Sequence, residues 1–313
     1  MAKDAMETQL TVAIAIPTYL REAVLVDTCR QVIALSPPPD EVLVIDQTPE
    51  HEPETESYLR AQCAAGRIRW IRHWPPNLPS ARNRALAETT ADIIIFIDDD
   101  VRLCKSFIEE HRKNFRDPKV QAVAGRILQP AAHRHPDPKA SWPQLMDYHF
   151  FRLDSSRRAE NVATFGGGNH SARVRFFKKL GGYDTNYTGW AFREDSDMAI
   201  RAWKGGGAIV FDPDAVLQHL AAPAGGCRLK HLHKRLPEWK VSFPATYFAM
   251  RHLFPSRWFW HDLLLGNVRR YVLRKENVFH PWRLPWAILS YLYSAGRSCW
   301  VSRRASSLHE AWE

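Results

Sequence analysis

Four short apolar runs rich in β-branched residues divide the first third of the chain. They span residues 11–16, 41–46, 67–72 and 91–98, and between them apolar residues recur at helical spacing over 21–35, 54–65 and 79–88. The uninterrupted apolar run Ile93–Ile97 within the fourth predicts a strand that is buried on both faces, and the other three runs predict strands as well. Strands that alternate with helices predict a mostly parallel sheet with helices on both sides. We therefore expect an α/β fold.

Polar residues follow three of these runs. Pro17 and Thr18 follow the first, Asp46 ends the second, and the aspartate triplet 98–100 follows the fourth. In an open parallel sheet, ligands gather at the carboxyl ends of the strands. Two carboxylates ~4 Å apart repel by roughly 4 kcal/mol at an effective dielectric near 20, and a bound cation would relieve that repulsion. A solvated turn in which one aspartate caps the next helix is the alternative, and the triplet alone favours neither.

Composition places the chain among globular proteins. With 313 residues and 45% hydrophobic composition, it suits one large α/β domain or one domain with an appendage. The five cysteines are odd in number and form no C-x-x-C pair, which argues against a disulfide framework and a structural zinc site. The first residues do not resemble a signal peptide, and no stretch reaches the ~20 apolar residues of a transmembrane helix. We expect a cytoplasmic protein.

The positive charge is concentrated at the C-terminal end. Of the net charge of +9, nearly all arises in residues 221–313, where 15 Lys and Arg face 5 acids and seven of the twelve tryptophans occur. This shift predicts a catalytic domain over 1–222 and a basic helical extension over 223–313. Tryptophan with arginine favours an anionic membrane surface, here the inner face of the plasma membrane. Packing against the domain and nucleic-acid binding remain as alternatives, and we do not expect nucleic acid as the partner.

Eight segments, in order, resemble the nucleotide-sugar glycosyltransferases of family 2, which have the GT-A fold. They are IAIPTYLRE, VLVIDQT, LPSARNRAL, FIDDDV, FGGGN, LGGYD, FREDSDMAIRAW and VLQHL, between residues 12 and 219. The resemblance implies an inverting, metal-dependent enzyme. It would transfer a sugar from a nucleotide diphosphate, first of all a UDP-sugar, to a hydroxyl of a glycan or lipid-linked glycan.

The aspartate triplet corresponds to the D-x-D motif of this family. The resemblance implies that Asp98 faces the ribose and the metal, that Asp100 binds the metal, and that Asp99 shares either task. Carboxylate oxygens suit Mn²⁺ or Mg²⁺ held jointly with a diphosphate. His219, at the end of a predicted strand, is similar to a histidine that completes the metal site in some GT-A enzymes, although a lone histidine is as readily a core residue.

Donor-binding residues also follow from the resemblance. Asp46 matches the family acid that hydrogen-bonds the base, with an Asx turn as its alternative. The glycine-rich segment FGGGN borders the donor sugar in the family, although a tight turn explains it equally well. The expected donor contacts are therefore Pro17, Thr18, Asp46, Arg82, Asn83, Asp98, Asp99, Gly168 and Asn169, with Arg228 as a clamp on the diphosphate.

The segment FREDSDMAIRAW predicts the start of a helix, since apolar residues recur behind its acids. Acids in a first helical turn can simply stabilise the helix. In the family, however, an E-D pair here supplies the general base, which implies that Asp195, next to Glu194, takes the proton of the acceptor hydroxyl. A positioned base typically contributes ~10²–10⁴-fold. Trp190 would stack on an acceptor sugar or pack against the sheet.

Two other functions share some of these features. A nucleotidyltransferase also combines an α/β sheet, acids and a metal, but the chain has no glycine-rich, lysine-bearing phosphate loop near its N-terminus. A nucleic-acid-binding protein would use the basic extension and would lose affinity steeply with salt.

Overall fold

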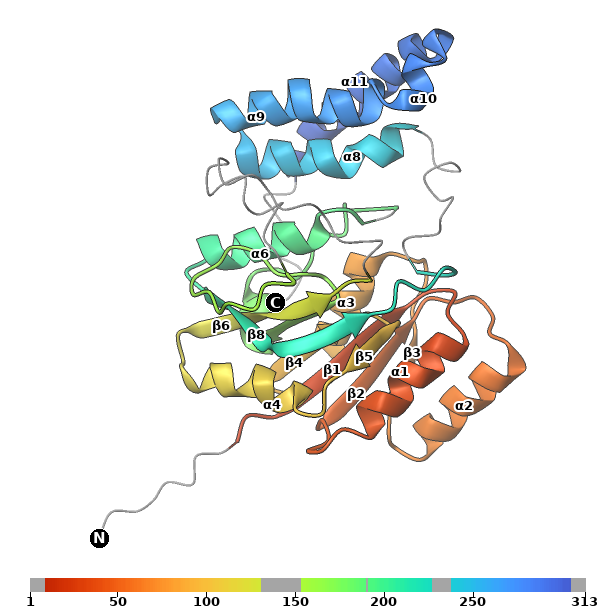
Figure 1. The fold of residues 1–313 in the computed structure, drawn as a ribbon, viewed down its shortest axis with the longest axis vertical. Coiled ribbons are helices and arrows are strands. Elements are labelled where there is room, and N and C mark those ends of the chain that lie inside the picture. Colours follow the sequence, from red (N-terminus) through yellow and green to blue (C-terminus); the bar gives the residue numbers. More distant parts are fainter. Residues whose placement is uncertain (1–8, 131–152, 190, 227–237, 305–313) are drawn as a thin grey trace.

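A single eight-stranded sheet forms the centre of the computed structural model, which describes residues 9–130, 153–189, 191–226 and 238–304 (Figure 1). The strand order is β3-β2-β1-β4-β7-β6-β8-β5. Six strands run in one direction, while β7 and β5 run against their neighbours. The strands are β1 Val12–Thr18, β2 Glu41–Asp46, β3 Arg69–Arg72, β4 Ile93–Ile97, β5 Val101–Leu103, β6 Val120–Leu128, β7 Asn169–Arg173 and β8 Ala208–His219. The predicted mostly parallel α/β sheet is confirmed.

Helices cover both faces of the sheet, which is why the central strands are buried throughout their length. One face packs against α1, α2 and α4 through Leu25, Leu59 and Phe107, and the other against α3, α5 and α6 through Ala85, Phe177 and Met198. These helices are α1 Ala23–Ile33, α2 Pro53–Ala64, α3 Leu78–Glu88, α4 Phe107–Arg112 with a 3₁₀ turn Lys113–Arg116, α5 Val174–Lys179 and α6 Glu194–Lys204.

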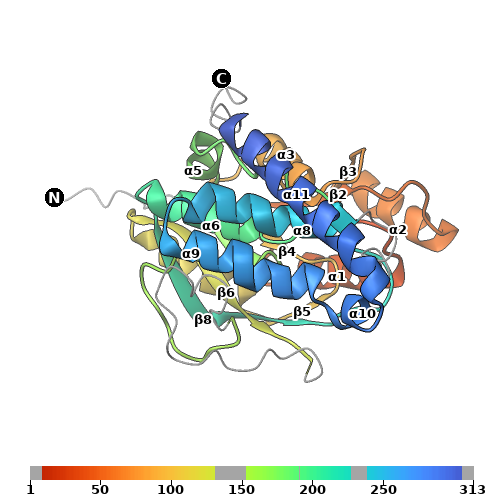
Figure 2. The same cartoon turned by 90° about the horizontal axis from the view of Figure 1, so that it is seen from above.

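A second layer of helices lies over α6, on the side away from the sheet (Figures 1 and 2). It has a core of its own, in which Leu253, Phe259 and Tyr291 are buried. Its elements are α8 Glu238–Phe248, α9 Arg257–His261, α10 Lys275–Val278 and α11 Leu284–Arg304, with π-helical turns at Ala249–Leu253, Asp262–Gly266 and Val268–Val272 and a 3₁₀ turn at Pro281–Arg283. The predicted C-terminal helices are present.

Buried charges join the helical layer to α6. Asp197 of α6 lies 2.7 Å from the His252 Nε2 atom of the layer and 2.8 Å from the Arg201 Nε atom. Arg251 pairs with Asp184 and also approaches Asp197. Removing one partner of a buried pair typically costs ~3–5 kcal/mol, so these contacts hold the layer in one orientation.

Two sequence-based expectations concerned membrane-spanning helices and disulfide bonds. Among the described residues, no helix has both the length and the apolar character needed to cross a membrane. Four cysteines lie in the described ranges, Cys29, Cys63, Cys104 and Cys299, and all four are free thiols.

Candidate active site

Three predicted metal ligands converge at the end of the sheet. One ligand atom from each of Asp98, Asp100 and His219 lies within 4.8 Å of the other two. The His219 Nε2 atom is 3.2 Å from Asp100 Oδ1 and 3.7 Å from Asp98 Oδ2. The cause is strand pairing: β5 follows the triplet and runs antiparallel to β8, with Val101 opposite His219. Residues more than a hundred positions apart therefore share one edge.

The chemistry of these three groups suits a divalent cation. The His219 Nδ1 atom lies 2.9 Å from Gln129 Oε1 and donates to it, which leaves Nε2, the atom that faces Asp98 and Asp100, as the one that would coordinate a metal. Burial acts to raise the pKa of Asp100, but the hydrogen bond and charge of His219 and the charge of Arg21 outweigh it and lower that pKa. An ionised carboxylate beside an imidazole is a donor set that Mn²⁺ or Mg²⁺ accepts.

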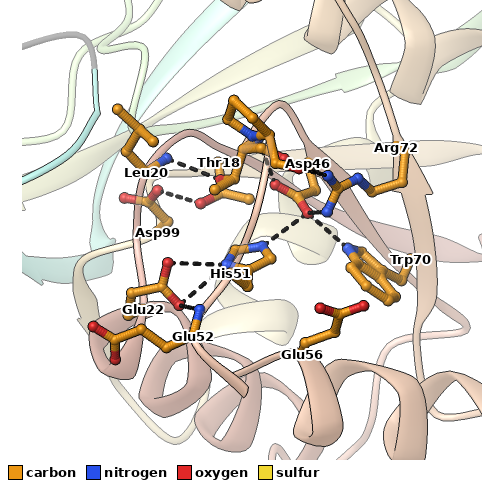
Figure 3. Close-up of polar contacts among 12 residues, drawn as sticks. Thr18, Leu20, Glu22, Asp46, His51, Glu52, Glu56, Trp70, Arg72 and Asp99 are labelled. Atoms are coloured by element: carbon orange, nitrogen blue, oxygen red, sulfur yellow. Dashed lines mark hydrogen bonds and ion pairs between the residues drawn. The ribbon is translucent and has the colours of Figure 1, made fainter. Parts of the chain in front are cut away.

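Arg21, which the sequence analysis did not single out, forms ion pairs with two aspartates of the triplet, Asp99 and Asp100. Its Nε atom is 3.2 Å from Asp99 Oδ1 and its Nη2 atom 3.2 Å from Asp100 Oδ2. Thr18 donates to Asp99 Oδ2 at 2.7 Å (Figure 3). Burial raises the pKa of Asp99 to about 7, with Arg21 opposing and Asp100 adding to the rise. Asp99 thus faces Thr18 and Arg21. The only sequence signal was a cation three residues after Thr18.

Two glycines connect the candidate metal ligands to the candidate base. A Cβ atom on Gly168 would lie 2.2 Å from Asp98 Oδ2, so the backbone passes directly against that carboxylate. The Gly167 N–H donates to Asp195 Oδ2 at 2.9 Å, and the Gly167 carbonyl accepts from Arg82 Nη2 at 2.9 Å. Asp98 and Asp195 therefore flank two consecutive residues. The bridge between Gly166 and Asn169 shows that the segment is also a tight turn.

The acids at the start of α6 have different surroundings. Glu194 is buried and forms an ion pair with the buried Arg82. Burial raises the pKa of the Glu194 carboxyl, and the charge of Arg82 opposes that rise. Asp195 is only partly buried, and its Oδ1 atom accepts from the Ser196 N–H at 2.7 Å. Of the two acids, Asp195 is the one that a substrate could reach.

Asp46 ends β2, lines a cavity and is surrounded by hydrogen-bond donors, which Figure 3 shows. Its Oδ1 atom accepts from the Thr48 N–H at 2.8 Å, and its Oδ2 atom lies 2.9 Å from His51 Nε2, 2.9 Å from Trp70 Nε1 and 3.1 Å from Arg72 Nη1. Burial acts to raise the pKa of Asp46, but these partners lower it overall. The cavity, of about 290 Å³, is lined by Asp46, Gln47, Thr48, Pro49, Arg72, His73 and Trp74.

The remaining predicted contacts lie elsewhere or outside the described residues. The Asn169 side chain is buried and donates to the carbonyls of Arg126 and Ala215, each at 2.9 Å. The Asn83 amide exchanges hydrogen bonds with the Tyr183 backbone. The structure does not bring these two side chains to the metal group. Pro17 is buried within β1, and Trp190 and Arg228 fall outside the described residues.

The sequence of this chain matches two known protein-family models. Residues 13–181, more than half of the chain, match the family model described as glycosyl transferase family 2. The chain belongs to glycosyl transferase family 2. Residues 149–220 of this family 2 chain also match a model described as the N-terminal domain of galactosyltransferase. The resemblance stated from eight sequence segments is confirmed.

Individual relatives are distant. The chain is 27% identical over 186 residues to a pre-mycofactocin glycosyltransferase of Mycobacterium tuberculosis, covering 57% of this chain and 37% of the relative. It is 26% identical over 259 residues to the probable N-acetylgalactosaminyltransferase 9 of Caenorhabditis elegans, covering 72% and 44%. This family 2 chain thus spans about two fifths of the length of the curated relatives it matches.

Solved structures show the fold. The mannosyltransferase PcManGT from Pyrobaculum calidifontis, in complex with GDP-Man and Mn²⁺, matches with a TM-score of 0.57 at 16% identity, covering 96% of this chain and 81% of that one. GalNAc-T7 with UDP, GalNAc and Mn²⁺ matches with a TM-score of 0.55 at 16% identity, covering 85% and 58%. The predicted GT-A fold is confirmed.

Proposed function

We propose that this family 2 protein is an inverting, metal-dependent glycosyltransferase. It moves a sugar from a nucleotide diphosphate, a UDP-sugar first of all, to a hydroxyl of a glycan or lipid-linked glycan. The observation that carries the proposal is the grouping of Asp98, Asp100 and His219, separated from Asp195 only by the Gly167–Gly168 backbone. Solved relatives that contain Mn²⁺ with GDP-Man or UDP support the same reading.

The chemistry is a single displacement. The acceptor oxygen bonds to the anomeric carbon while the bond from that carbon to the diphosphate oxygen breaks, and Asp195 takes the proton of the acceptor hydroxyl. Mn²⁺ or Mg²⁺ held by Asp98, Asp100 and His219 would neutralise the charge of the departing diphosphate. Arg82, through its ion pair with Glu194, fixes the first turn of α6 and so orients the base.

The donor pocket lies toward β1 and β2. We assign the nucleobase to the cavity that Asp46 lines, with Thr18, Asp98 and Asp99 on the ribose side. Pro17, Arg82, Asn83, Gly168 and Asn169 shape the backbone around the donor, Arg228 clamps the diphosphate, and Trp190 contacts the acceptor. We further assign catalysis to residues 1–222 and acceptor or membrane contact to 223–313, with the enzyme cytoplasmic and peripheral on the inner face of the plasma membrane.

Two substitutions test the proposal. Asp195→Asn should abolish sugar transfer, a loss of at least ~10²-fold in turnover, while nucleotide binding with Mn²⁺ stays nearly intact. Asp100→Ala should instead weaken metal-dependent nucleotide binding. Asp27→Asn, whose side chain is 67% exposed on α1, is the matched control and should change neither. Near-normal turnover of Asp195→Asn would show that another group is the base.

Substrate identity is measured separately. A thermal-shift panel of nucleotide sugars, with and without Mn²⁺, should show stabilisation that requires both the correct donor and the ion, because a ligand that binds only the native state stabilises it by mass action. Product analysis should find a nucleoside diphosphate. Release of pyrophosphate from a nucleoside triphosphate would instead identify a nucleotidyltransferase.

A further inference from the structure

Helix α11 packs against the protein mainly through small residues, together with the buried Tyr291 and Val301. Ala287, Ser290, Ser294 and Ser298 are buried on its inner side. The Thr246 Oγ1 atom of α8 lies 2.9 Å from the Ser294 hydroxyl and 2.7 Å from the Ser298 hydroxyl. Close packing of helices through small residues joined by hydroxyl hydrogen bonds is typical of helices that meet inside lipid.

The opposite side of α11 carries large apolar residues in contact with solvent. Trp286, Leu289, Leu292, Tyr293 and Trp300 are 66%, 60%, 59%, 54% and 52% exposed. Their spacing of three, four and seven residues places them on one side of the helix, and we call these five residues the outer face of α11. A helix that covers a protein core in water has the reverse arrangement, with apolar residues inward and polar residues outward.

Exposed apolar residues also occur in other segments of the helical layer, whose helices Figure 2 shows from above. Phe279 and Trp282, which precede α11, are 75% and 73% exposed, and Leu264 and Leu265 after α9 are 57% and 63% exposed. Monomeric proteins rarely expose contiguous apolar patches larger than a few hundred Å² unless the patch binds something. The outer face of α11 is therefore a candidate binding surface.

The positive charge of the helical layer indicates which kind of partner the outer face of α11 binds. Residues 238–304 contain eleven Lys and Arg against three acids, and α11 itself carries Arg297, Arg303 and Arg304 with no acid. The Arg304 guanidinium lies 3.9 Å from the centre of the Trp300 ring. A two-fold dimer through the outer face would bring together two layers that each carry this excess of positive charge, and they would repel. A nucleic acid would not accept exposed leucines, whereas an anionic lipid surface accepts tryptophan, leucine and arginine together.

We propose that the outer face of α11 lies in the headgroup region of an anionic lipid bilayer. The proposal deepens, and rests on, the proposed function at a membrane. The layer contacts the catalytic helix directly, since Arg193, just before Glu194, is 3.6 Å from Asp262. Binding through α11 thus holds the start of α6 at a set distance from the lipid, which suits a lipid-linked acceptor.

Vesicle flotation of the full chain tests this without donor or metal. We expect the protein to float with phosphatidylglycerol-containing vesicles and much less with pure phosphatidylcholine vesicles. Trp286→Ser combined with Leu289→Ser should weaken flotation at least about tenfold. Replacing Arg297, Arg303 and Arg304 by Gln should weaken it about fivefold per arginine.

Matched controls separate this surface from general loss of tryptophan or charge. Trp203→Ser on α6, 37% exposed, and Gln at Arg30, Arg60 and Arg116, whose side chains are 63%, 70% and 77% exposed, should leave flotation unchanged. Asp195→Asn should float normally even without activity, so the proposed function can fail independently of this one. Two results would overturn lipid docking: equal flotation of the α11 variants and the wild type, or a lipid-free dimer that the α11 substitutions dissociate.

Discussion

Gly168 lies so close to Asp98 that adding one methyl group tests the metal site. The Cβ atom of Gly168→Ala would lie 2.2 Å from Asp98 Oδ2 and 2.6 Å from Asp98 Cγ. Carbon and oxygen atoms in contact normally lie ~3.3–3.6 Å apart, so the carboxylate must retreat by about 1 Å. The Asp98 side chain is 40% exposed, so it can turn into solvent at little cost in stability.

That displacement is large compared with what a metal site tolerates. Distances from metal to ligand hold to within ~0.2 Å, and disturbing the group that orients a ligand typically costs ~10–100-fold in metal affinity. We therefore expect Gly168→Ala to bind Mn²⁺ in the presence of UDP ~10–100-fold more weakly, or about 1.4–2.7 kcal/mol. Its unfolding midpoint in denaturant should stay close to that of the wild type.

Isothermal titration of Mn²⁺ into the protein with UDP measures the effect. Gly296→Ala is the control, because a Cβ atom there meets nothing within 4 Å and its backbone needs no left-handed conformation. That variant should bind Mn²⁺ like the wild type. A folded Gly168→Ala protein with unchanged Mn²⁺ affinity would refute Asp98 as a metal ligand.

Three further predictions concern the candidate base Asp195, the metal ion, and the buried ion pairs that Asp197 of α6 makes with the helical layer. Gly167→Ala should lower turnover more than Mn²⁺ affinity, because its Cβ atom would lie 2.7 Å from Arg82 Nη2 and 3.3 Å from Asp195 Oδ2; initial rates and titration separate the two. Chelation should abolish transfer, and Mn²⁺ should restore it better than Mg²⁺, because imidazole suits Mn²⁺. Asp197→Asn should cost ~3–5 kcal/mol of unfolding free energy at pH 7. Arg201, Arg251 and His252 lower the pKa of Asp197 despite its burial. The stability from its charge is therefore fully present above the unfolded pKa near 3.8 and is lost only as the pH falls through the much lower folded pKa, so the difference between the two proteins should begin to narrow near pH 4 and continue to narrow below pH 3 in denaturant titrations.

Local pattern was sufficient for several strands and helices of the α/β fold. The predicted run 41–46 is β2, and the predicted helices 54–65 and 79–88 match α2 and α3 to within one residue at each end. The helical spacing of apolar residues identified the helices. Burial identified the strands, because a strand covered on both faces must be apolar along its length. The acids at the strand ends were equally visible, since the carboxyl ends of parallel strands share an edge.

Tertiary structure decided which of those polar residues meet. The sequence contained His219 and Asp100, but only the antiparallel pairing of β5 with β8 places them 3.2 Å apart. Arg21 showed no local signal beyond its place three residues after Thr18, because its burial beside Asp99 depends on the contact between β1 and the end of β4. The sequence by itself determined the strands, the helices and the acidic edge, since these depend on neighbours along the chain. Only the folded sheet decided the contacts within the site, since they join residues far apart in the sequence.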